Sequence, residues 1–296
     1  MKRFKNIFVA AGRDERGRRA QHRAAMLSVE LQAATLEMMT FNSDNKMLGT
    51  PNEDDTGTNA GAPAPQWPAQ SFSANAPTVD KPNLIRSIGF GTPALAVVAR
   101  AEEMEADLIV LPSHGENFLQ NLIIRRRNEV LLRATNRSVL LVQTEPRSGY
   151  RQILVAVDMS KESKEAARNA LLLAPNAHVA FVHAYQVPNE EIMRDFSVPN
   201  EKIKFYRERV ECMARLRLKQ FVDDLGLQRQ CSRTIHRGDP VETISNFALH
   251  LGADLIAMGR HDQSEISQLL LGSVMQRVIS KVPCDLLLAG SHHADQ

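Results

Sequence analysis

The two halves of this 296-residue chain repeat each other at an almost constant offset. Residues 106–109, Ala-Asp-Leu-Ile, recur at 253–256, which is 147 positions later. Residues 7–10, Ile-Phe-Val-Ala, return as Ile-Leu-Val-Ala at 153–156, shifted by 146. Chance matches do not stay in register over such a span, so the chain contains two copies of one fold, and the sequence of each copy serves as a control for the other.

Composition supports two packed units and excludes several classes of protein. Hydrophobic residues make up 43% of the chain, which is enough for a core in each half without disulfides. The three cysteines, Cys212, Cys231 and Cys284, show no paired spacing, so we expect neither a disulfide framework nor a zinc site, and a reducing cytoplasm fits best. We expect a soluble protein without a membrane span, because no segment has about 18 consecutive apolar residues.

Charge gives little support for a polyanionic partner. The net charge is only +2, whereas nucleic-acid binders concentrate far more positive charge, so we expect no nucleic-acid partner. The basic cluster near the start is interpreted as the solvated face of a helix. It consists of Arg13, Arg16, Arg18, Arg19 and Arg23.

Each half alternates short β-branched and apolar runs with longer helical stretches, which is typical of a parallel sheet covered by helices. In the second half the predicted strands are 153–157, 178–183, 232–235, 254–258 and 285–288, and the helices are 163–173, 201–225, 241–251 and 273–281. In the first half the predicted strands are 7–11, 35–40, 84–88, 107–111 and 139–142, and the helices are 20–31, 93–105 and 128–134. The predicted fold class is therefore α/β: two tandem, doubly wound, five-stranded parallel-sheet domains of the Rossmann-like kind, at 1–144 and 151–290.

One segment departs from the repeat. Where the second half has its longest helix, the first half has residues 42–82, rich in Gly, Pro, Asn, Ser and Thr. Such a composition buries too little apolar surface to offset its ordering entropy, so we predict a mobile loop, with Trp67 and Phe72 as possible docking points.

Ligands of open α/β sheets bind outside the carboxyl ends of the strands, so the residues after each strand are the candidate site. In the second half these are Asp158, Ala184 and the segment 259–262, Gly-Arg-His-Asp. Gly272 and Ser273 then open the last predicted helix, whose free N–H groups suit a phosphate. The same residues have a plain structural interpretation: Ser273 with Gln276 forms a capping box, and Asp158 caps the first helix of this half.

At this point the sequence resembles the universal stress protein family over essentially its whole length, as a tandem pair. Nucleotide-binding members of that family carry Gly, two residues, Gly, nine residues, and then Gly followed by Ser or Thr. Here Gly259, Asp262 and Gly272-Ser273 keep that spacing, with an aspartate in place of the middle glycine. The turn at 238–240, Gly-Asp-Pro, and the junction at 281–288 also resemble the family pattern.

The resemblance implies an adenine nucleotide alpha hydrolase-like fold that binds ATP or a related adenine nucleotide, with Mg²⁺ where a cation bridges the phosphates. By carry-over, Asp158 contacts the nucleoside and Ala184 offers backbone groups to the base. The ribose and phosphates are expected at Gly259, Arg260, His261, Asp262, Gly272, Ser273 and Val274. Asp262 opposes binding, because a carboxylate repels a polyphosphate and its Cβ restricts the backbone.

The first half lacks these features. Gly12 replaces Asp158, Pro112 replaces Gly259, and Arg125-Arg126 replace Gly272-Ser273, whereas Gly115 stands where the second half has Asp262. Proline has no N–H to donate, and arginine does not permit the close backbone approach of glycine. We therefore expect the first half to be a degenerate partner domain.

The sequence predicts a cytoplasmic regulatory module and no enzyme, because no Walker loop, nucleophile elbow or metalloprotease motif is present. The resemblance also implies that the last strands of the two halves pair, which makes the monomer a pseudo-dimer; a further homodimer is possible. Two alternatives stay open: a stress-response scaffold that binds an unknown protein partner without nucleotide, and an enzyme that uses Asp158 or Asp262 with a metal.

Overall fold

The computed structural model describes residues 4–12, 14–40, 82–88, 93–113, 131–132, 134–227, 231–260 and 273–289. The predicted loop 42–82, except Pro82, lies outside these residues, and so does most of the predicted helix 128–134.

In the described residues of the first half there are five strands and two helices with defined bounds. These are β1 (Asn6–Ala11), α1 (Glu15–Glu30), β2 (Thr35–Thr40), β3 (Asn83–Ile88), α2 (Pro93–Glu103), β4 (Leu108–Pro112) and β5 (Ser138–Val142).

Among its described residues, the second half has five strands and five helices. These are β6 (Gln152–Ala156), α4 (Lys161–Leu173), β7 (His178–Tyr185), α5 (Glu190–Asp195), α6 (Asn200–Asp223), β8 (Cys231–Arg237), α7 (Pro240–Leu251), β9 (Leu255–Gly259), α8 (Ser273–Lys281) and β10 (Asp285–Ala289). All ten predicted strands are confirmed, but α5 was not predicted.

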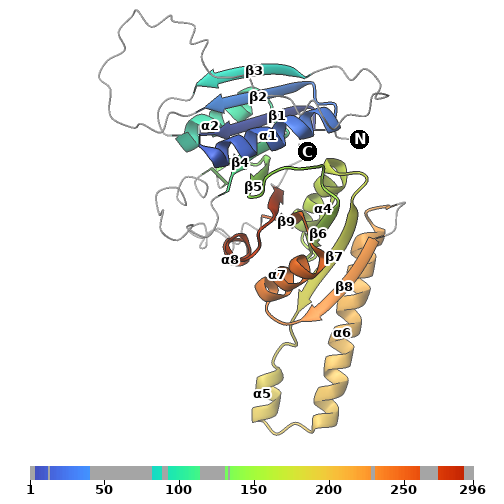
Figure 1. Ribbon diagram of the computed structural model, residues 1–296. Helices are drawn as coiled ribbons and strands as arrows, with labels where there is room; N and C mark the ends of the chain where they lie inside the picture. Colours follow the sequence, from blue (N-terminus) through green and yellow to red (C-terminus); the bar gives the residue numbers. More distant parts are fainter. Residues whose placement is uncertain are drawn as a thin grey trace, which may run out of the picture.

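All ten strands belong to one sheet, in the order β3-β2-β1-β4-β5-β10-β9-β6-β7-β8. Strands within each half are parallel, and the halves join where β5 and β10 pair antiparallel, with Leu140 opposite Leu287. Figure 1 shows the two halves as separate lobes that meet at this strand pair. The predicted pairing of the last strands is thus confirmed within the chain.

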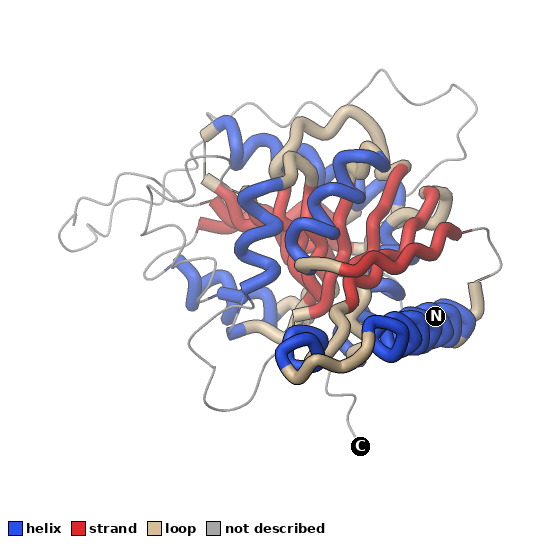
Figure 2. The backbone as a smooth tube through the Cα atoms, turned by 90° about the horizontal axis from the view of Figure 1, so that it is seen from below, coloured by secondary structure: helices blue, strands red, loops and turns tan. Residues whose placement is uncertain are grey.

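Helices cover both faces of the sheet, with the strands between them (Figure 2). Strand residues alternate between the faces: Ile7 and Val9 pack with α1 on one face, whereas Phe8 and Ala10 pack with α2 on the other. On the first face α1, α4 and α6 share one apolar cluster, and α2, α7 and α8 share the second. This alternation follows from the two-residue period of a strand and makes the sheet a doubly wound one.

A repeated aspartate starts the same contact in both halves. Asp107 accepts backbone N–H groups from Lys5 at 2.8 Å and Asn6 at 3.0 Å, at the beginning of β1. Asp254 accepts the N–H groups of Arg151 at 2.7 Å and Gln152 at 3.2 Å, at the beginning of β6. The repeated Ala-Asp-Leu-Ile sequence therefore has a structural reason in each half.

A buried polar cluster lies where the halves join. The carboxylate of Asp285 is fully buried and accepts hydrogen bonds from Arg23 Nε at 3.2 Å and Tyr150 Oη at 2.6 Å. It also accepts the N–H groups of Gln143 and Thr144, which follow β5 and lead into the linker between the halves. The interpretation of Arg23 as part of a solvated face was wrong, because only 4% of this residue is exposed.

Candidate nucleotide site

The topology brings three of the predicted site residues to neighbouring strand ends. In the second half β6 lies between β9 and β7, so the strand order reverses there, which is the switch point where such sheets bind ligands. Asp158 follows β6, Gly259 ends β9 and Ala184 lies near the end of β7. These three residues therefore lie at one edge of the sheet, as predicted from the sequence.

Asp158 is exposed at this edge and supports the start of α4. Its Oδ1 accepts hydrogen bonds from the backbone N–H of Ser160 at 2.9 Å and from Ser160 Oγ at 2.5 Å. Ser160 is the N-cap residue, because its Oγ accepts the N–H of Ser163 at 3.0 Å. The N-cap residue of α4 is therefore Ser160 and not Asp158. The hydrogen bonds from Ser160 hold the Asp158 carboxylate at the carboxyl ends of the strands.

Gly259 is required by packing, independently of any ligand. A Cβ at this position would lie 2.5 Å from the carbonyl carbon of Glu162 and 2.6 Å from the backbone nitrogen of Ser163. Both atoms belong to the first turn of α4, so no side chain fits between this turn and the end of β9. The glycine brings the N-terminus of α4 directly against the candidate site.

Arg260 contacts the first half of the molecule. Its backbone N–H donates to the carbonyl oxygen of Ala289 at 3.1 Å, which continues the pairing of β9 with β10. Its guanidinium donates to the carbonyl oxygens of Leu132 and, at 3.0 Å, of Arg137. Both carbonyls belong to the first half, so this side chain links the two halves near the site.

The structure describes only some of the remaining predicted site residues. Ala184 lies inside β7, because the strand continues to Tyr185 rather than ending at His183. The backbone of Ser273 begins α8, and Val274 packs its side chain against the apolar core. His261, Asp262 and Gly272 lie outside the described residues.

An ion cluster beside β7 and β8 was missed by the sequence analysis. Glu190, the first residue of α5, is buried and receives hydrogen bonds from Arg194 at 2.9 Å, Arg237 at 2.7 Å and Arg207. The pKa of the Glu190 carboxyl is lowered, first by the hydrogen bond from Arg207. The cluster joins α5, α6 and the end of β8. A six-residue helix is too short for a clear periodic pattern, so the sequence offered no signal for it.

Tyr185 is the last residue of β7. Burial raises the pKa of its phenol, and the charge of Glu211 and a hydrogen bond to Glu211 raise it further. At the ends of β6 and β7, His183 Nδ1 lies 2.7 Å from the carbonyl oxygen of Val157, so this histidine joins the two strand ends.

The matching edge of the first half is described only in part. Gly12 follows β1, and Pro112 ends β4, where the second half has Asp158 and Gly259. Gly115 and Arg125–126 lie outside the described residues. At the two matched positions that are described, Gly12 offers no carboxylate in place of Asp158, and Pro112 offers no peptide N–H in place of Gly259.

Two kinds of feature are absent from the described part of the chain. There, no three His, Cys, Asp or Glu side chains come together in a way that could hold a metal ion. In the same residues, no helix combines the length and apolar character needed to cross a bilayer.

Sheet order, helices on both faces and the switch-point edge define an α/β protein built from two nucleotide-fold units in tandem. The chain belongs to the universal stress protein family, whose sequence model matches it twice, over residues 3–143 and 149–290.

A curated relative and two solved structures are among the proteins similar to this chain. The universal stress protein E homolog of Haemophilus influenzae is 27% identical over 200 residues, which is 65% of this chain and just under two thirds, 64%, of the relative. A crystal structure of a protein of unknown function from Pseudomonas aeruginosa PAO1 superimposes with a TM-score of 0.64 at 18% identity, covering 97% of this chain and 92% of that one. A universal stress protein solved in complex with cAMP is 26% identical over 49% of this chain and all of its own, with a TM-score of 0.37.

Proposed function

We propose that this chain is a cytoplasmic regulatory protein that binds ATP or a related adenine nucleotide through its second half. The first half acts as a partner domain without a nucleotide site. The protein responds to the nucleotide by binding it and does not catalyse a reaction.

The observation that carries this proposal is the placement of the strand ends. Asp158, Ala184 and Gly259 lie on three neighbouring strands at the switch point, and α8 begins at Ser273, just after the family-like spacing Gly259, Asp262, Gly272. A helix N-terminus at the phosphate end and strand-end carbonyl and N–H groups at the base end suit an adenine nucleotide.

The predicted site residues differ in what they contribute to nucleotide binding. The Asp158 carboxylate is exposed at the edge, and a ribose hydroxyl there would donate a hydrogen bond to it in addition to those from Ser160. Arg260 is assigned to the contact with the first half, so phosphate binding would depend on backbone N–H groups and on any bridging Mg²⁺. Asp262 is the residue that opposes the phosphates by its charge.

Calorimetric titration of the full chain with MgATP tests the proposal, together with mass analysis of nucleotide released on denaturation. We expect about one equivalent per chain, because only the second half keeps the strand-end features. No binding by the wild type and no carried nucleotide would overturn the proposal.

Variants at the glycine-rich spacing then locate the site. Gly272→Arg copies the first half and should abolish binding, and the matched first-half variant Arg125→Ala should leave it unchanged. Asp262→Gly restores the family residue and should tighten binding about tenfold by removing a repulsive charge. Gly259 is unsuitable for this test, because a Cβ there collides with α4 whether or not nucleotide binds.

A further inference from the structure

Helices α5 and α6 form a helical projection at one end of the molecule: α5 and the first part of α6 extend beyond the sheet, and the rest of α6 lies beside β8 (Figure 1). Seven large apolar side chains are exposed in the part of the chain that the structure describes, and five of them are on this projection. They are Ile192, Phe196, Phe205, Met213 and Leu216. This concentration marks the projection as a contact surface, since exposed apolar residues elsewhere in the described chain are single.

On α6 the exposed apolar residues form a stripe. Phe205, Met213 and Leu216 occupy positions i, i+8 and i+11, which fall within about 80° of one another at 3.6 residues per turn. Phe205 is 67% exposed and Leu216 is 56% exposed. The opposite face of the helix buries Leu218 and Phe221 in the core, so the stripe is a second apolar face with no partner among the described residues.

Basic side chains flank the stripe. Residues 205–219 contain five basic and two acidic residues. Two of the arginines are already used, since Arg207 binds Glu190 and Arg215 pairs with Glu211 at 2.9 Å. Three basic residues form no ion pair with any residue that the structure describes: Arg209, Arg217 and Lys219. Because Glu211 already pairs with Arg215, Glu208 is the one acidic residue of this segment left to offset their positive charge.

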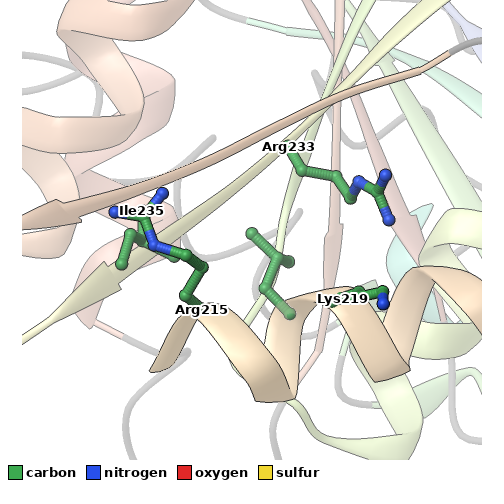
Figure 3. Close-up of a pocket in the computed structure, with 5 residues that line it drawn as sticks. Arg215, Lys219, Arg233 and Ile235 are labelled. Carbon is green, nitrogen blue, oxygen red and sulfur yellow. The ribbon is translucent and has the colours of Figure 1, made fainter. Parts of the chain in front are cut away.

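A groove adjoins the stripe on the side facing β8. It has a volume of about 230 Å³, with Arg215 and Lys219 on α6, Arg233 on β8, and Leu218 and Ile235 as its apolar lining (Figure 3). Arg233 is partly neutralised by Asp223 at 3.3 Å. The groove therefore favours a small acidic side chain beside an apolar one.

These charges decide between possible occupants. A second copy of this chain would bring two α6 helices together, each with seven basic and four acidic residues, and like charges oppose that pairing. Binding to an anionic membrane is disfavoured by the end of the projection, because residues 189–201 carry four acidic residues and one basic residue.

We propose that the outward face of α6, from Phe205 to Lys219, docks an acidic amphipathic helix of a protein partner. The apolar side of that helix covers Phe205, Met213 and Leu216 over about three turns, and its carboxylates reach Arg209, Arg217 and Lys219. A carboxylate side chain enters the groove beside Arg233. This surface is distinct from the candidate nucleotide site.

Fluorescence anisotropy with the full chain and two designed peptides tests this proposal. Both peptides are helical with leucine at the same positions on one face, and the other positions carry glutamate in one peptide and lysine in the second. We expect micromolar binding of the acidic peptide and at least about tenfold weaker binding of the basic one. Absent or equal binding of the two peptides overturns the proposal.

Variants at exposed positions locate the contact without disturbing the core. Phe205→Ser with Leu216→Ser should weaken binding at least about tenfold, because two apolar anchors are lost. Leu249→Ser on α7 is the matched control, since Leu249 is 57% exposed and lies outside the projection. Arg217→Glu with Lys219→Glu should reverse the preference between the peptides.

Three further results would overturn the proposal. They are unchanged binding by the Phe205/Leu216 variant, a concentration-dependent dimer that this variant abolishes, and sedimentation with phosphatidylserine vesicles in place of peptide binding. Unfolding temperature and circular dichroism confirm that each variant folds. Gly272→Arg should keep full peptide binding, so failure at the nucleotide site and failure at α6 are distinguishable.

Discussion

Matching positions of the two halves make the same contact across the central strand pair with different chemistry. Arg23 on α1 corresponds to Asn169 on α4, and Asp285 at the start of β10 corresponds to Ser138 at the start of β5. Arg23 Nε donates to Asp285 at 3.2 Å, and Asn169 Nδ2 donates to Ser138 Oγ at 3.0 Å. The pseudo-symmetric packing is therefore kept, while the polar groups within it have diverged.

The charged pair, Arg23 and Asp285, differs from the neutral pair, Asn169 and Ser138, in the additional groups that it binds. Asp285 accepts hydrogen bonds from Thr144 and Tyr150, and Arg23 donates to the carbonyl of Ser148 at 2.8 Å. Burial raises the pKa of the Tyr150 phenol well above its usual value, and the charge of Asp285 raises it further, so this hydroxyl stays a donor. The charged side thus fastens the linker between the halves, whereas the neutral side joins only α4 to β5.

The largest expected effect comes from copying the neutral side onto the charged one. Asp285→Ser should lower the free energy of unfolding by about 3–5 kcal/mol, because it leaves the buried guanidinium of Arg23 without its carboxylate. Urea unfolding followed by circular dichroism measures this loss. Ser138→Ala, the matched change in the first half, should cost only about 1 kcal/mol.

A double variant sharpens the same comparison. Arg23→Asn combined with Asp285→Ser reproduces the pair at Asn169 and Ser138, and it should recover part of the stability lost in Asp285→Ser alone. Equal losses for Asp285→Ser and Ser138→Ala, or no recovery in the double variant, would show that the charge at this contact has no special role.

A second divergence is a buried carboxylate in the first half, Glu37, whose matching position in the second half is apolar. Glu37 on β2 is fully buried and pairs with Arg100 on α2 through two hydrogen bonds of 2.8 and 2.9 Å, and it also accepts from Ser87 at 2.7 Å. The strand registers match Glu37 with Ala180, and the repeat matches Arg100 with Phe247. The second half fills the equivalent space with apolar side chains.

Glu37→Gln should destabilise the protein by about 2 kcal/mol, because an amide replaces a carboxylate that accepts charge-assisted hydrogen bonds. The matched control uses the other carboxylate of the same arginine. Glu103 lies 2.7 Å from Arg100 but is 68% exposed, so Glu103→Gln should cost less than about 0.5 kcal/mol. Similar urea midpoints for the two variants would mean that burial of Glu37 adds nothing to the pair.

The same carboxylate predicts a pH dependence. Burial raises the pKa of Glu37, but the hydrogen bonds from Arg100 and Ser87 and the charge of Arg100 lower it more, so the net pKa lies below the usual value. A lowered pKa gives stability that is fully present above the unfolded value of about 4.3 and is lost as pH falls through the folded value. The stability difference between wild type and Glu37→Gln should therefore shrink below about pH 4, and a constant difference would contradict this assignment.

The fold was predictable because the repeat and the strand periodicity are local patterns, as the agreement at Thr35–Thr40 and Ser273–Lys281 shows. The contacts between side chains that are far apart in the sequence were not predictable. Arg23 and Asp285 are 262 residues apart, and nothing near Arg23 in the sequence distinguishes it from the exposed arginines beside it. Glu37 did carry a signal, since it is a lone acid inside an otherwise strand-like run. The contact of Arg260 with the first half was not predictable either, because it depends on how the two halves pack. The sequence after β9 gives no information on that packing.

A smaller expected effect provides the strictest test of the repeat. Asp107 and Asp254 are the same residue in both halves and accept equivalent pairs of backbone N–H groups, so Asp107→Ala and Asp254→Ala should each cost about 1 kcal/mol. Burial raises the pKa of the Asp254 carboxyl, while the N–H groups of Arg151 and Gln152 lower it, so its hydrogen bonds offset its desolvation only in part. A loss at Asp254 that exceeds the loss at Asp107 by more than about 1 kcal/mol, measured by urea unfolding of the two single variants, would show that the halves have diverged even where sequence and geometry agree. Equal losses would confine the divergence to the polar contacts at Asp285 and Glu37.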